Sequence, residues 1–170
     1  MNNRSENLAR RLEDGARSLM AFARGLSDAD WKQSTPGDGR AVGVIVHHVG
    51  SVYPVEIELA QSIARGVAVT GVTWDVICDM NATHAATNTA VTKDEALALL
   101  EQNSRAAAAA IRALDDGSLD NAVTVSLYAD APLTCQFFLE DHAVRHSYHH
   151  LAKLRAALSG EARGIASVAL

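Results

Sequence analysis

Histidine is the residue type whose number and spacing in this sequence could do chemistry. The chain has seven histidines in 170 residues, and six of them fall in two short stretches, residues 47–48 and 142–150. His146 and His150 are four residues apart, a spacing that places both imidazoles on one face of a helix, about 6 Å from each other. Two such imidazoles can reach one metal ion, provided that a third ligand comes from elsewhere in the chain.

Apolar residues three and four positions away indicate which histidines face the protein interior. His146 and His150 continue an apolar stripe of Leu139, Ala143, Leu154 and Ala157, and His48 continues one of Ala41, Ile45, Val52, Val55 and Leu59. The histidines that share their faces with polar or charged residues, and should face solvent, are His47, His142 and His149. We therefore predict a site for one divalent metal at His48, His146 and His150, with zinc and nickel as the metals best suited to imidazole ligands.

The elements that must position these histidines are helices. Alanine is abundant, aromatic residues make up only 5% of the chain and there are only three prolines, a composition that favours helix over sheet. Apolar residues recurring every three or four positions predict long helices over residues 5–26, 40–65, 92–117 and 132–159 and a short one over residues 74–85. We expect an all-α four-helix bundle with one extra short helix, forming a single domain over residues 1–170.

Local signals predict where these helices begin, bend and end. Ser5 is an expected N-cap, and Thr92 with Glu95 three residues later forms a capping box. Pro54 should kink the second helix, and Gly160 should stop the last one. Residues 26–39 are expected to form a loop anchored by Trp31, and residues 118–131 contain a segment that could pair as a short extended arm.

Charge and composition exclude several classes of partner. A net charge of −5 argues against a protein that binds nucleic acid or an anionic membrane surface. No stretch approaches the roughly 18 apolar residues of a membrane span. The two cysteines, Cys78 and Cys135, do not form a CxxC pair, which is typical of reduced thiols in a cytoplasmic protein. We expect a cytoplasmic protein whose partner is a small molecule.

Two segments resemble a known family. The resemblance is to the DinB/YfiT-like metalloenzymes, and it lies in GRAVGVIVHHV at residues 39–49 and HSYHHLAKLRAAL at residues 146–158. In that family, an early helix carries a motif that ends in His-Leu. A late helix carries the motif HxxxH followed by Gly-Gln. The resemblance places His48, His146 and His150 at the family's three metal-ligand positions. It departs from the family at Arg40, where a tryptophan is frequent, and at residues 152–153, where Ala-Lys replaces Gly-Gln.

The resemblance implies a four-helix bundle, often a homodimer, that binds a divalent metal in a groove. Characterised relatives include S-transferases and isomerases that use a low-molecular-weight thiol. The metal could activate a water or a thiol for attack on a small-molecule substrate. No catalytic residue is assigned: Glu56, Glu140 and Asp141 are candidate bases by their positions in the sequence, and none is preferred. The absence of an obvious base favours thiol transfer.

Two other functions compete with this enzyme hypothesis. The chain could be a non-catalytic helical ligand-binding or stress-response module whose metal is structural, closed by a fourth ligand from Cys135 or His84, or absent. The histidines could also be ordinary core and surface residues that bind no metal, as most single histidines are. A closed, non-exchangeable site would distinguish the first of these from an enzyme.

Overall fold

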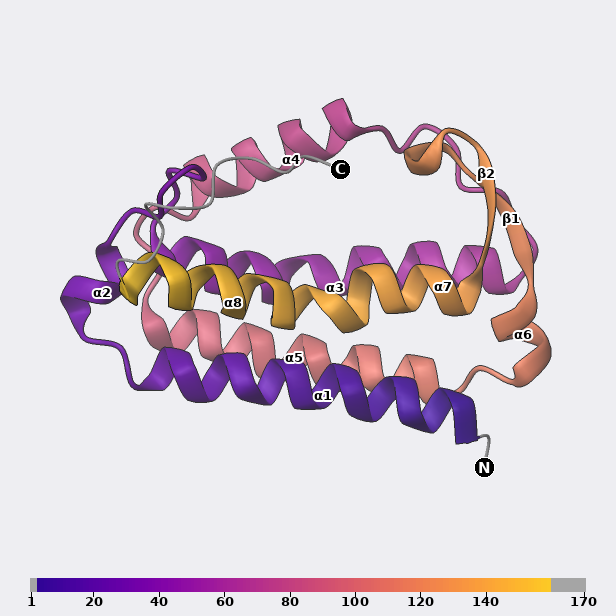
Figure 1. Cartoon of the computed structure of the whole chain (residues 1–170), viewed down its shortest axis with the longest axis horizontal. Helices are drawn as coiled ribbons and strands as arrows, with labels where there is room; N and C mark the ends of the chain where they lie inside the picture. The colour runs from indigo at the N-terminus through magenta and orange to yellow at the C-terminus, as the bar shows by residue number, and fades with distance from the viewer. Residues whose placement is uncertain (1–2, 160–170) are drawn as a thin grey trace.

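The protein, described over residues 3–159 by a computed structural model, is a four-helix bundle with a small hairpin and an outlying helix (Figure 1). The expected all-α bundle is confirmed. The bundle helices are α1 (Asn3–Arg24), α3 (Val42–Ala64), α5 (Lys93–Arg112) and a composite last helix made of α7 (Cys135–Leu139), the π-helical turn η2 (Glu140–Val144) and α8 (Arg145–Ser159). The outlying helix, α4 (Trp74–Thr87), lies along the outside of this bundle.

The core forms where the apolar stripes of the bundle helices meet. In α1 the predicted periodicity is seen directly, with Leu8, Leu12 and Leu19 among its buried residues. Burying each such side chain contributes about 1.5–3 kcal/mol. Close approach of α3 and α5 depends on Gly50, because a Cβ atom there would lie 2.9 Å from the Cα atom of Leu100. The α1–α3–α5 side of the bundle is therefore tightly packed.

The connection between α1 and α3 is more ordered than the predicted loop. It contains a short helix, α2 (Asp28–Lys32), which begins at a capping box formed by Ser27 and Asp30. Trp31 is the anchor that the sequence predicts: it is buried, and its Nε1 donates to the carbonyl of Val91 at 3.0 Å. A Cβ atom at Gly43 would lie 2.3 Å from the indole, so this glycine makes room for the ring.

Three of the predicted helix ends are wrong, whereas the predicted start of α5 is confirmed. Ser5 lies inside α1 and is not its N-cap, because the helix already includes Asn3. The capping box of Thr92 and Glu95 begins α5 as predicted. The sequence predicts that α5 ends at residue 117 and that the last helix starts at residue 132, but the structure has these ends at Arg112 and Cys135. The predictions are wrong because the flanking residues form a short helix and a strand of their own.

These flanking elements are α6 (Asp116–Asp120) and the strands β1 (Ala122–Val125) and β2 (Ala131–Thr134). The strands pair antiparallel with Val123 opposite Leu133, which confirms the predicted extended arm. A 3₁₀ turn, η1 (Ser126–Tyr128), connects them through Ala129 and Asp130, both at positive φ (53° and 59°). Residues 132–133 therefore belong to β2 and not to the last helix.

The hairpin and the segment before α4 hold each other in place. Val69 donates to Thr124 at 3.0 Å and accepts from the backbone of Ser126 at 2.9 Å. Thr73 then caps α4, whose bounds agree with the predicted short helix to within two residues at its end. α4 has no buried residue, in contrast to the bundle helices. It covers one side of the bundle without joining its core.

Two further predictions concern Pro54 and Gly160. Pro54 lies inside α3, which continues through it to Ala64. Gly160 lies outside the described residues. Between residues 3 and 159 no helix combines the length and the apolar character needed to cross a membrane.

Candidate metal centre

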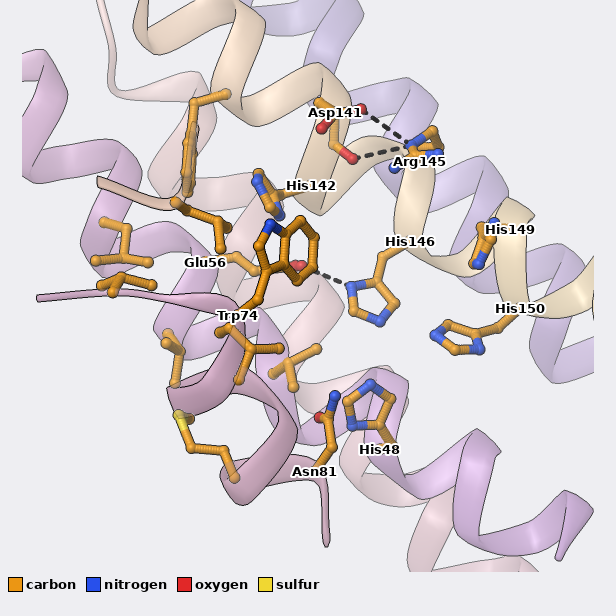
Figure 2. Close-up of a pocket in the computed structure, with 18 of the residues that line it drawn as sticks. His48, Glu56, Trp74, Asn81, Asp141, His142, Arg145, His146, His149 and His150 are labelled. Carbon is orange, nitrogen blue, oxygen red and sulfur yellow. Dashed lines mark hydrogen bonds and ion pairs between the residues drawn. The ribbon is translucent and has the colours of Figure 1, made fainter. Parts of the chain in front are cut away.

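The structure brings the three predicted ligands together. His48 comes from α3, and His146 and His150 come from successive turns of α8. Their imidazoles point toward one another (Figure 2), with ring centroids 5.3 Å apart for His48 and His146, 5.4 Å for His48 and His150, and 4.8 Å for His146 and His150. One potential ligand atom of each residue lies within 4.8 Å of the other two. One metal ion could therefore be approached by all three side chains.

The ring nitrogens of this cluster fit a metal better than they fit the surrounding protein. His48 is 5% exposed and His150 is 8% exposed. Nδ1 of both residues and Nε2 of His146 are buried and have no hydrogen-bond partner among residues 3–159. A buried polar atom without a partner costs about 1–3 kcal/mol. A divalent ion bound to imidazole nitrogens would remove part of that cost, so the residues present fit such an ion.

Burial also keeps these imidazoles neutral, which metal binding requires. Desolvation, with a smaller contribution from the neighbouring His146, lowers the pKa of His48 from 6.5 to about 3. Burial lowers the pKa of His150 still further, again with His146 contributing. At neutral pH protons therefore do not compete with a metal for these two rings.

A buried carboxylate orients the third ring. Nδ1 of His146 lies 2.6 Å from Oε1 of Glu56, a residue of α3 whose side chain is almost fully buried. Donation from Nδ1–H to this carboxylate leaves the lone pair on Nε2, the atom without a partner. Carboxylates behind metal-binding histidines fix the ring and its tautomer in this way. The sequence signal is that Glu56 follows His48 by eight residues, about two helical turns, on the same inner face.

The other two acids proposed as bases are engaged elsewhere. Glu140 pairs with Arg11 at 2.7 Å on the protein surface. Asp141 accepts a hydrogen bond from the hydroxyl of Tyr128 and pairs with Arg145 at 3.2 Å. Tyr128 was not predicted to be near this site, because only the hairpin brings it back to the last helix.

Neither candidate for a fourth ligand belongs to the cluster. Within residues 3–159 the group able to hold a metal comprises the three histidines alone. The Cys135 thiol donates to the carbonyl of Ala60 at 3.3 Å, and burial raises its pKa to about 11. His84 of α4 lies beside the cluster, its ring 5.4 Å from that of His48, but its Nε2 is 2.9 Å from Nδ1 of His47.

Two of the histidines predicted to face solvent do not. His47 is half-buried against His84. His142 is half-buried beside Phe138, at a ring separation of 4.4 Å, and its Nε2 is 2.9 Å from the Tyr128 hydroxyl. The π-helical turn η2 explains the wrong prediction for His142. A π-helical turn is wider than an α-helical turn, so it changes the orientation of the preceding side chains relative to the following ones. His149 is exposed as predicted.

The three histidines line a cavity of about 400 Å³ between α3, α4, the hairpin and the last helix. One part of its wall is apolar and consists of Val52, Val55, Leu59, Val72, Trp74, Ile77, Met80, Leu127 and Phe138. The polar part includes Glu56, Tyr128, Asp141, His142, Arg145 and His149, which are described above, and adds Asp38, Arg40, Asn81 and Lys153. An apolar enclosure with a few convergent polar groups is the usual form of a small-molecule site.

Comparison with known proteins agrees with this architecture. The sequence model described as the DinB superfamily matches residues 11–154. YfiT from Bacillus subtilis, described as a probable metal-dependent hydrolase with an unusual four-helix bundle topology, superposes with a TM-score of 0.74 at 18% identity, over 93% of this chain and 87% of YfiT. A protein from Exiguobacterium sibiricum assigned to the DinB family superposes with a TM-score of 0.57 at 20% identity, over 99% of this chain and 98% of the other.

These structural likenesses show a shared fold. No functionally curated protein matches the sequence. The family model covers most of the chain, including all three histidines of the cluster. The chain belongs to the DinB superfamily.

Proposed function

We propose that this protein is a metal-dependent enzyme acting on a small molecule, with zinc or nickel bound by His48, His146 and His150. The observation that carries the proposal is the buried histidine cluster, whose unpartnered ring nitrogens lie in the wall of a largely apolar cavity. The probable metal-dependent hydrolase YfiT shares the fold and supports the same assignment. The predicted homodimer and the cytoplasmic location remain predictions.

The protein's own groups have defined tasks in this proposal. Three neutral ligands leave coordination positions open, where a bound divalent ion would act as a Lewis acid toward a water or a thiol. Glu56 holds the proton on Nδ1 of His146 and fixes that ring. The apolar wall formed by α3 and α4 gives the substrate an apolar surface to pack against.

Thiol transfer is the reaction class that the arrangement of acids favours. Asp141 is held by Tyr128 and Arg145, and Glu56 directs one oxygen to His146. Asp141 therefore has no free oxygen and Glu56 has only one, whereas an activated thiol needs no carboxylate base. Hydrolysis is the second candidate, because Oε2 of Glu56 is buried without a hydrogen-bond partner among the described residues and could accept a proton.

A non-catalytic protein with a structural metal would require a closed site. In the described part of the chain no fourth protein side chain joins the three histidines. The lining also offers space for a ligand next to them. Both features support an open, catalytic site over a closed one.

Cobalt substitution tests whether the site is open. The protein, freed of metal and loaded with Co²⁺, would be titrated with L-cysteine while the visible absorption spectrum of the cobalt is recorded. We expect a saturable change as the thiol enters an open position, and no cobalt spectrum in His48→Ala. Arg155→Ala, which alters an exposed residue of α8 outside the cavity lining, should behave as the unmodified protein. A cobalt spectrum that thiol leaves unchanged would contradict the proposal.

A further inference from the structure

Arg40 presents an unused guanidinium edge at the cavity. It precedes α3, its side chain is 16% exposed, and it lines the same cavity as His48 and His150. Nε and Nη2 bind the two carboxylate oxygens of Asp38, the second at 2.7 Å, whereas Nη1 is buried with no hydrogen-bond partner among residues 3–159. A guanidinium has five N–H groups, and Asp38 takes only two of them. The free edge matches a second anion in shape and charge.

A second cationic side chain lines the cavity without an ionic partner among the described residues. Asp38 neutralises Arg40, but Lys153 of α8 lines the cavity as well and forms no ion pair within the described part of the chain. The guanidinium of Arg40 lines the same cavity as the three histidines of the cluster. An anionic group bound by Arg40 would therefore lie in the same cavity as the proposed metal.

The rest of the cavity favours an apolar body. Trp74, Ile77 and Met80 of α4 line it, yet α4 has no buried residue and Trp74 is 63% exposed. On the opposite wall, Val52 and Leu59 of α3 are only partly buried. A ligand between these helices would cover apolar surface that the protein alone leaves open, at a gain of about 25 cal/mol per Å².

We propose that the cavity binds a small anion, a carboxylate or phosphate group on an apolar body, with the anionic group held by Arg40 and Lys153 and the body under α4. The inference rests on the proposed function only in one respect, namely that this anion is the substrate of the enzyme. Charge-assisted hydrogen bonds to the guanidinium supply specificity for the anionic group. Contact with the apolar wall supplies most of the binding free energy.

Calorimetric titration of metal-free protein tests the inference without any activity assay. The probes are phenylacetate, phenylphosphonate and the neutral 2-phenylethanol, which share one ring and differ in the polar group. We expect at least one of the two anions to bind about tenfold more tightly than the alcohol, as one charge-assisted hydrogen bond implies. The tighter of the two anions identifies the group as carboxylate or phosphate.

Variants locate the binding to this edge of the cavity. Arg40→Met should weaken binding of the anion about tenfold and leave the alcohol unaffected. Lys153→Met should weaken binding of the anion about threefold. Lys153 is exposed, so it can be replaced without destabilising the fold. Arg17→Met is the matched control, because Arg17 pairs with Asp14 at an exposed position on α1.

Equal binding of anions and alcohol, or no binding of any probe, would overturn the inference. So would anion binding that survives both Arg40→Met and Lys153→Met. Metal content, measured separately, keeps this inference distinct from the proposed function. If metal binds at the histidines and anions do not bind, only the substrate class is wrong, whereas anion binding by a protein that takes up no metal would refute only the metal-dependent enzyme.

Discussion

The two faces of α3 show how this protein separates stability from chemistry. One face meets α5 so closely that Gly50 touches the backbone of Leu100. The opposite face carries His48 and Glu56 beside a cavity, where buried polar atoms lack partners within the described residues. Unsatisfied polar groups destabilise the folded state, so they persist only where packing elsewhere compensates. The packed face stabilises the fold, and the cavity face uses part of that stability to hold reactive groups in place.

The largest expected effect comes from the packed face. Leu100→Ala should lower the free energy of unfolding by about 3 kcal/mol, because it leaves a void in a fully buried site. Leu59→Ala, at a half-buried position lining the cavity, should cost less than about 1 kcal/mol. Chemical denaturation of both variants measures the difference. Equal losses would show that the two faces do not differ in packing.

Acidification should lower the free energy of unfolding through a histidine on the cavity face. The pKa of His48 is about 3 in the folded protein, against 6.5 for an ordinary histidine. The contribution of neutral His48 to the free energy of unfolding is present above pH 6.5 and is lost as the pH falls below it. The loss arises because the unfolded chain then binds a proton that the folded protein cannot bind. At about pH 5 the loss from this residue is about 2 kcal/mol.

Denaturation of the metal-free protein between pH 7 and pH 5 measures this loss. His48→Gln cannot take up the proton, so its stability should fall less steeply over the same range. Parallel curves for the two proteins would mean that His48 is not held neutral by burial.

A smaller effect is expected from the carboxylate behind His146. Glu56→Gln keeps the size of the side chain but removes the charged acceptor for the Nδ1 proton, so affinity for zinc should fall by about tenfold. Competition with a chromophoric chelator would measure it. Glu58→Gln, an exposed change on the same helix, should leave the affinity unchanged. Equal affinities for all three proteins would show that Glu56 does not support the site.

Regular periodicity made the bundle and the histidine cluster predictable. Apolar stripes indicated that His48, His146 and His150 face inward, and the structure places them together. Thr92 and Glu95 marked the start of α5 because a capping box is a purely local signal. Features of this kind depend on neighbours within one helix, which a single sequence displays directly.

Features that depend on distant contacts or on irregular backbone were missed. The π-helical turn η2 has no clear sequence signal, so the orientation of His142 was predicted wrongly. Glu56 was named as one of three acids, but only the packing of α3 against α8 shows that it binds His146. Arg40 was noted as a departure from the family pattern, and its place in the cavity wall became visible only in three dimensions.

Elemental analysis of untagged protein tests the central claim most directly. The unmodified chain, His48→Ala, His146→Ala and the control His149→Ala would be purified without a metal-affinity step and then offered zinc and nickel. We predict about one equivalent of metal in the unmodified protein and the control, and none in the other two, because each removes one of three ligands. No bound metal in the unmodified protein, or metal retained by both ligand variants, would contradict the account.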